Sequence, residues 1–75
     1  MDEPETRARS NEIGRRLAQA LTELPAVQRE AFLLQQEAGL PLAEIASITG
    51  VGEETVKSRL RYATTSLRTA LEPLR

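Results

Sequence analysis

A group of hydrogen-bond donors lies in the last third of the chain, within two helical turns of one another. Five of the six residues from position 57 to position 62 can donate: Lys57, Ser58, Arg59, Arg61 and Tyr62. Cationic and hydroxyl side chains of this kind bind phosphate oxygens and the edges of bases. The whole chain has a net charge of −1, yet residues 56–68 contain four bases and no acid. The positive charge is therefore local, which predicts a small footprint on nucleic acid.

Two apolar patterns place these donors on a helix that leaves a tight turn. The first pattern has the i, i+3, i+4, i+7 spacing of one helical face, at Leu42, Ile45, Ala46 and Thr49. The second predicts a longer helix, at Val56, Leu60, Ala63 and Leu67. Gly50 stands between them, where a helix commonly ends in a left-handed residue. The spacing predicts a helix-turn-helix with the donors facing outward, and a simple helical hairpin is the alternative.

Two more helices are expected before this turn. The first would be capped by Ser10 or Asn11, with an apolar face of Ile13, Leu17, Leu21 and Leu24. The second would begin at Pro25 and end at Gly39, with Phe32 beside a face of Val27, Ala31, Leu34 and Ala38. We therefore predict an all-α domain of four helices over residues 11–75, with a C-terminal helix-turn-helix. Residues 1–10 are expected to form a flexible N-terminus or a linker.

Composition argues against several classes of function. The 75 residues suffice for one domain, and they include neither Cys nor His. Thiolate and imidazole metal ligands are therefore missing, as is the commonest general base. No apolar run approaches the roughly 20 residues that span a bilayer. We expect no enzyme, no cofactor or metal, no small-molecule substrate and no membrane insertion.

Two stretches resemble a known family, region 4 of bacterial sigma factors and especially the extracytoplasmic-function (ECF) type. They are LPAVQREAFLLQQEAGLPLAEIA (Leu24–Ala46) and GVGEETVKSRLRYATTSLR (Gly50–Arg68). The resemblance implies a cytoplasmic, nucleoid-associated role in bacterial transcription initiation. In this family the first two helices clasp the flap tip of the RNA polymerase β subunit. The last helix enters the major groove of the promoter minus-35 element, and an anti-sigma factor often covers both surfaces.

The resemblance and the donor cluster together give a candidate DNA-contacting set: Arg29, Thr55, Lys57, Ser58, Arg59, Arg61 and Tyr62. Arg29 could equally be a plain solvated side chain, and the Tyr62 ring could pack against the helix edge. The chain departs from the family pattern at Glu54, where many members have glycine, and at Tyr62 and Thr64–Thr65, where basic residues are common. Glu53 and Glu54 are interpreted as favourable charges at the positive end of their helix.

The sequence also permits two alternative interpretations. The chain could be a sigma-like interaction domain that binds an anti-sigma factor without touching DNA. It could also resemble the C-terminal domain of LuxR-like regulators, although the LPAVQREAFLL segment fits a sigma factor better. Because it lacks the sigma region 2 that melts the minus-10 element, we expect either an excised domain or another use of the fold. Three consecutive residues of the second helix, Phe32, Leu33 and Leu34, predict a partly exposed docking surface.

Overall fold

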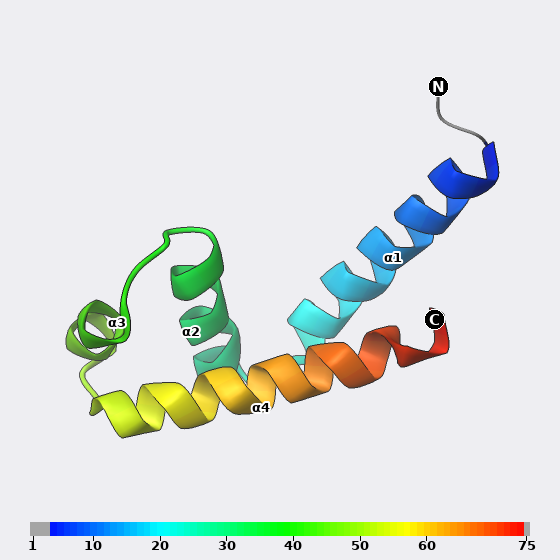
Figure 1. Ribbon diagram of the computed structural model, residues 1–75. Helices are drawn as coiled ribbons and strands as arrows, with labels where there is room; N and C mark the ends of the chain where they lie inside the picture. The colour runs from blue at the N-terminus through cyan, green and yellow to red at the C-terminus, as the bar shows by residue number, and fades with distance from the viewer. Residues whose placement is uncertain (1–3, 75) are drawn as a thin grey trace.

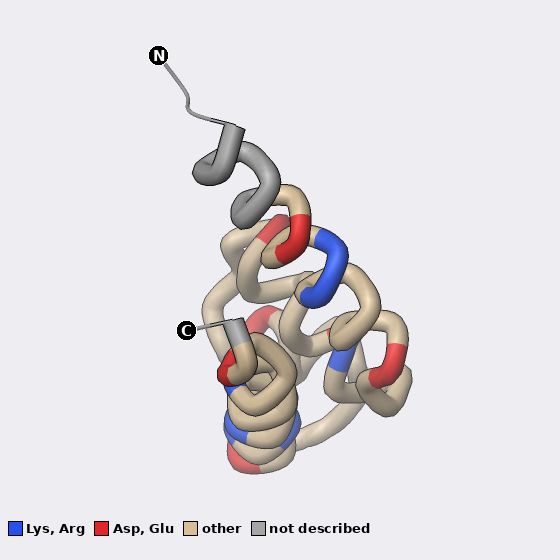
Figure 2. Tube along the Cα trace, turned by 90° about the vertical axis from the view of Figure 1, so that its right-hand side faces the viewer, with Lys and Arg blue, Asp and Glu red and all other residues tan. Residues whose placement is uncertain are grey.

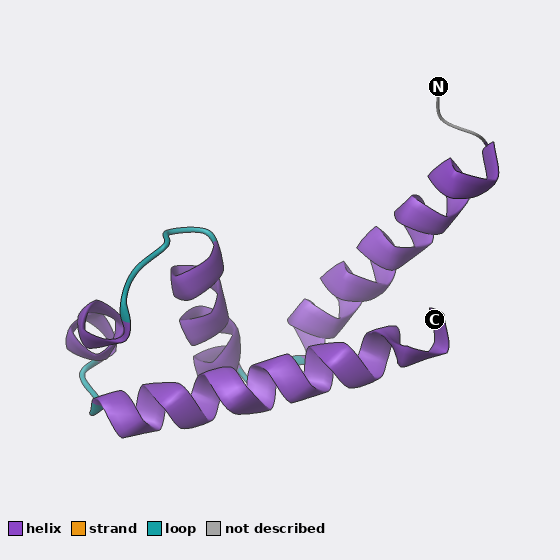
Figure 3. Ribbon diagram, in the orientation of Figure 1, coloured by secondary structure: helices purple, strands orange, loops and turns teal. Residues whose placement is uncertain are grey.

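The computed structural model describes residues 4–74 of the chain, and the side chains of residues 11–73. This part contains α1 (Pro4–Glu23), α2 (Ala26–Gln36), α3 (Leu42–Thr49), α4 (Glu53–Leu71) and a 3-10 turn, η1 (Glu72–Leu74). Figure 3 shows only helices and loops over these residues. The predicted all-α class with four helices is confirmed, and α3 and α4 form the helix-turn-helix.

The other helices all pack on one side of α4. Figure 1 shows α1, α2 and α3 above α4, and the perpendicular view of Figure 2 agrees. α4 contacts each of the three. The described molecule is elongated, with extents of 45 Å along its longest axis and 16 Å along its shortest. In Figure 1, α1 rises away from α4 from the place where the two helices meet. No other described helix covers the opposite side of α4.

The first core cluster joins α3 to α2 and to the N-terminal half of α4. Its buried members are Ala31, Ile45, Ala46, Val56 and Leu60. The side chains of Ile45 and Val56 have no exposed surface, and burial of such a side chain stabilises a fold by roughly 1.5–3 kcal/mol. Ala46 is small where α3 meets its neighbours, so the helices can approach closely. This cluster is the predicted helix-turn-helix core.

The second core cluster joins α1 to the C-terminal half of α4. It consists of Ala20, Leu24, Ala63 and Leu67. Partly buried side chains of α1 and α2 pack against it, namely Leu17, Leu21 and Phe32. The four residues predicted for the apolar face of α4 are all buried, two in each cluster. One face of α4 therefore supports the whole domain.

The turn between α3 and α4 depends on the backbone of Gly50. Its φ of 72° and ψ of 29° lie in the left-handed region, as predicted. This conformation lets the N–H groups of Gly50 and Val51 donate to the carbonyl oxygen of Ala46, at 2.9 and 3.2 Å. The Val51 side chain then packs against the first cluster. Thr49, the polar member of the α3 face, donates its hydroxyl to the Ile45 carbonyl at 2.7 Å.

Two predicted helix boundaries are wrong by three residues or more, and the predicted start of α2 at Pro25 is one residue early. α1 begins at Pro4 instead of after a cap at Ser10 or Asn11. Residues 5–9 contain no glycine or proline, and a proline at a first helical position sacrifices no hydrogen bond. Residues 1–3 lie outside the described part of the chain, and the proposed division at residue 10 stays a prediction. α2 ends at Gln36, so Gly39, with a φ of 65°, belongs to the loop that follows.

The predicted apolar face of α2 is only partly correct. Ala31 is buried and Leu34 packs beside it, but Val27 is 47% exposed and Ala38 lies beyond the end of the helix. Ala38 does not belong to the face, because helical periodicity no longer applies beyond Gln36. Pro25 precedes α2 as its N-cap, and its carbonyl oxygen accepts the N–H groups of Gln28 and Arg29 at 3.0 Å each.

Replacement of Gly50 by valine should lower the free energy of unfolding by more than about 1 kcal/mol, because a β-branched residue is strained at positive φ. A Cβ atom at Gly50 would meet nothing within 4 Å, so the cost comes from the backbone alone. Gly52 is the matched control. It is equally uncrowded but has a φ of −76°, so Gly52→Val should lose only the N-cap preference for glycine and lower stability less than Gly50→Val. Thermal or urea unfolding of both variants measures the difference, and equal stability would contradict this account of the turn.

Candidate nucleic-acid interface

The predicted donors of α4 lie between its buried positions and around its uncovered side. Thr55, Lys57, Arg61 and Tyr62 are exposed, whereas the buried residues of the helix face the other three helices. Figure 2 shows the basic positions along α4 and acidic positions near both of its ends. The structure thus brings these four side chains to one accessible stretch of helix.

Ser58 and Arg59 are half-buried, unlike the other donors of α4. Arg59 lies three positions after Val56 and directly before Leu60, both of which are buried, so it stands at the border of the packed face. Its stem can cover apolar surface while its guanidinium stays in water. Among the donors of α4, Lys57 and Arg61 are therefore the more accessible cations.

Arg61 and Tyr62 form a cation–π pair. The guanidinium carbon of Arg61 lies 5.3 Å from the centroid of the Tyr62 ring. The tyrosine is 56% exposed, so its ring is not packed into either core cluster. An exposed pair of this kind contributes about 0.5–1 kcal/mol and restricts the directions that the guanidinium samples. Tyr62 thus has a physical role at this surface besides any contact of its own.

Arg29 donates hydrogen bonds to several backbone carbonyls at the end of α1. Its Nη1 atom donates to the carbonyl oxygens of Thr22 at 3.0 Å, Leu24 at 3.3 Å and Leu21 at 3.4 Å. These carbonyls belong to the C-terminal end of α1 and to the first residue beyond it, where a helix carries unpaired acceptors and partial negative charge. Arg29 therefore caps α1 from the first turn of α2. Whether it also contacts DNA stays a prediction.

A signal for this cap was present in the sequence. The last turn of α1 contains no basic residue of its own, although cations are favoured there. Arg29 is the next basic residue along the chain, and it follows the Leu24–Pro25 break by only four residues. The missing information was the angle between the two helices, which decides whether the side chain reaches.

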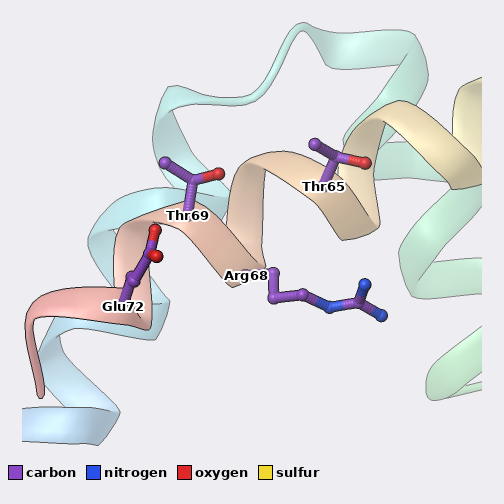
Figure 4. A pocket seen from close by; sticks show the side chains of 4 residues that line it. All are labelled: Thr65, Arg68, Thr69 and Glu72. Atoms are coloured by element: carbon purple, nitrogen blue, oxygen red, sulfur yellow. The ribbon is translucent and has the colours of Figure 1, made fainter. Parts of the chain in front are cut away.

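Other polar groups lie on the surface of α4 and α1. A shallow hollow on the C-terminal half of α4 is lined by Thr65, Arg68, Thr69 and Glu72, and Figure 4 shows Arg68 extending away from Glu72. Within residues 11–73, no polar or charged residue is buried. The described residues contain no group of three potential His, Cys, Asp or Glu metal ligands. No described helix is both long and apolar enough to cross a membrane.

Comparison with known proteins agrees with the geometry. The family description that matches residues 14–67 is "Sigma-70, region 4". This match includes the core of the domain, the turn at Gly50 and the donor cluster of α4. The chain belongs to the sigma-70 region 4 family. Within this family the chain is a region 4 domain of the ECF type.

Curated relatives of this region 4 domain include the ECF RNA polymerase sigma factor SigL from Mycobacterium tuberculosis strains H37Rv and CDC 1551. Each is 41% identical over 58 residues, which cover 77% of this chain and 33% of the relative. The chain thus spans about a third of the length of the curated relatives it matches. The similarity supports the ECF type expected from the sequence.

The α1 cap predicts a structural role for Arg29. Arg29→Met keeps most of the stem and removes the donors, so it should lower the free energy of unfolding by about 1 kcal/mol, the usual net worth of such hydrogen bonds. Arg16→Met is the control, because Arg16 is exposed on α1 and donates no hydrogen bond among the described residues. Chemical unfolding measures both variants. If the two substitutions had the same effect, Arg29 would be no more than a solvated arginine.

Proposed function

We propose that this domain reads the promoter minus-35 element with α4 and docks on the β flap of RNA polymerase with α1 and α2. The observation that carries the proposal is the division of α4 into two sides. One side is buried against all three other helices, and the other holds the accessible donors Lys57 and Arg61. A helix with this division can enter a groove without giving up its packing.

The dimensions of α4 suit the major groove. An α-helix with its side chains is about 10–12 Å wide, and the groove of B-DNA is about 12 Å wide. The N-terminal half of α4 follows directly from the turn, and it carries Thr55, Lys57, Ser58, Arg59 and Arg61. Other helices pack behind it, so the backbone would be held at a fixed height over the bases. This arrangement favours base reading over loose electrostatic attachment.

Few cations are available, so the isolated domain should bind DNA weakly. If three or four side chains neutralise phosphates, log K falls with log salt at a slope of roughly −3. Tethering to polymerase, which holds the same DNA, can raise avidity by about 10² to 10⁴ without new contacts. A chain with a net charge of −1 is therefore consistent with promoter binding when it acts within a larger assembly.

Lys57→Ala and Arg61→Ala should each weaken binding to the preferred duplex by about 1–3 kcal/mol where the side chain reads a base, and should relax the preference at that base. A residue that contacts only phosphate would instead weaken all duplexes equally and make the salt slope shallower by about one. The assay is binding of the domain at low salt to duplexes with systematically varied minus-35 sequences. Arg15→Ala, on the exposed part of α1, is the control.

Sequence-independent affinity that neither alanine substitution changes would favour the second candidate, an interaction domain that binds an anti-sigma factor without DNA. The positive result for this second candidate would be that both alanine variants bind an acidic protein partner more weakly. An anti-sigma factor is also expected under the main proposal, because it would mask the same surfaces. The DNA assay therefore decides between the two candidates, and detection of an anti-sigma factor alone does not.

The polymerase-docking surface is proposed on the apolar residues that the two core clusters leave open. Phe32, Leu33 and Leu34 are all half-buried, as expected. Phe32 packs on the second cluster and Leu34 on the first, whereas Leu33 belongs to neither. On α1, Ile13 is 38% exposed at the end of the stripe that continues through Leu17. Apolar side chains left open on two adjoining helices suit an inserted partner helix.

Leu33→Ser should weaken capture of the polymerase β flap tip at least several-fold while changing the melting temperature little, since Leu33 contributes to neither core cluster. Ile48→Ser is the matched control. Ile48 is apolar and 62% exposed, but it lies on α3, away from the proposed surface. Titration of the flap-tip peptide measures both variants. Equal loss in the two variants, or no loss in either, would remove Leu33 from the docking surface.

A further inference from the structure

One acidic side chain lies among the proposed DNA-contacting residues of α4. Glu54, Ser58, Arg61 and Thr65 follow one another at i, i+4, i+7 and i+11, so they share the side of the helix opposite the buried positions. The Glu54 side chain is 90% exposed, and thus no part of the described chain shields it. A carboxylate at this place would approach the phosphate backbone together with the donors.

Glu54 is paired with one of those donors. Its Oε1 atom lies 3.3 Å from Nζ of Lys57, one helical turn further along, and the lysine side chain is 55% exposed. This is the one ion pair among the side chains that the structure describes. An exposed pair of this type adds little to stability. Its position on the donor surface therefore points to an effect on binding more than on folding.

We propose that Glu54 suppresses binding of the domain to DNA of unrelated sequence, by holding Lys57 and by placing a negative charge among the donors. The inference rests on the proposed function, since it requires the N-terminal half of α4 to face DNA. Sequence-independent affinity comes from cations that neutralise phosphates. Lys57 must break its ion pair with Glu54 before it can bind a phosphate. The Glu54 carboxylate then lies unpaired close to the phosphates, which repel it.

The penalty has different consequences at different sites. At a preferred sequence, hydrogen bonds to base edges from residues such as Ser58 and Arg61 offset the repulsion. Unrelated DNA offers no such bonds, so the repulsion remains uncompensated there. Because competing sites are numerous in a genome, a lower affinity for unrelated DNA leaves less of the domain bound there. Glu54 is thus a residue that limits how much of the domain is held on unrelated DNA.

The test is Glu54→Gln, which keeps the size of the side chain and removes its charge. Binding of the 75-residue chain at low salt to a duplex of unrelated sequence should tighten about two- to fivefold, the range expected from one exposed ion pair. The plot of log K against log salt should steepen by up to about one, because Lys57 becomes fully available. Binding to the best duplex of the varied minus-35 set should tighten by a similar factor, because the carboxylate repels the phosphates of either duplex.

Glu53→Gln is the matched control, because Glu53 is an exposed acid in the same helical turn without an ion pair among the described residues. It should show less than half of the Glu54→Gln gain. In a Lys57→Ala background the Glu54→Gln gain should shrink to the part that comes from repulsion between the carboxylate and the phosphates, which separates release of the lysine from loss of negative charge. Thermal melting of each variant verifies that the helix is intact.

Affinity for unrelated DNA that is the same in Glu54→Gln and in the unmodified chain would overturn the inference. So would equal gains from Glu53→Gln and Glu54→Gln, or a gain that persists in full without Lys57. Failure of the proposed function has a different signature, in which the unmodified chain shows no preference within the varied minus-35 set. A chain that prefers certain duplexes but ignores Glu54→Gln refutes the role of Glu54 alone.

Discussion

The buried face of α4 is the constraint on which the rest of the structure depends. Val56 and Leu60 complete the cluster with α2 and α3, and Ala63 and Leu67 complete the cluster with α1. Because these positions share one helical face, α4 cannot rotate about its axis without opening both clusters. The same packing fixes the direction of the uncovered side. Core packing and donor presentation are therefore two consequences of a single helix orientation.

The core that fixes this helix is small. Among the described side chains, four of the nine buried residues are alanines, which allow close helix crossings but bury little apolar surface each. A domain of 75 residues also has an unfavourable ratio of surface to volume. Contacts at the junctions consequently matter, including the Arg29 cap on α1 and the paired N–H groups at Gly50. A polymerase partner that covered the open apolar side chains of α1 and α2 would stabilise the folded domain as it binds.

A rigid α4 also connects the two proposed surfaces. Its N-terminal half carries the donors, and its C-terminal half supports α1. Docking of α1 and α2 on a large assembly would therefore orient the donors without any conformational change in the domain. In this arrangement few charges are needed on the DNA side, because the tether supplies most of the avidity. The slightly acidic composition and the local basic stretch are consistent with an arrangement in which the tether supplies avidity and a few donors contact DNA.

The sequence by itself determined the type and order of the helices, the buried face of α4 and the left-handed turn. These features depend on local rules, namely helical periodicity at positions such as Val56 and Leu60 and the steric freedom of Gly50. It also indicated the family, since the match covers residues 14–67. The sequence did not determine where α1 begins. The residues between Pro4 and Ser10 include no helix breaker, so no local signal distinguishes a start at Pro4 from a start at Ser10.

Only the tertiary structure decided which side chains have partners. Arg29 reaches the carbonyls of α1 because of the angle at which α2 meets α1, and no local pattern encodes that angle. Val27 is exposed although its spacing matches that of the buried Ala31. The pairing of Lys57 with Glu54 depends on rotamers that i, i+3 spacing permits but does not select. Periodicity specifies a face of a helix, whereas the packing between helices decides what that face meets.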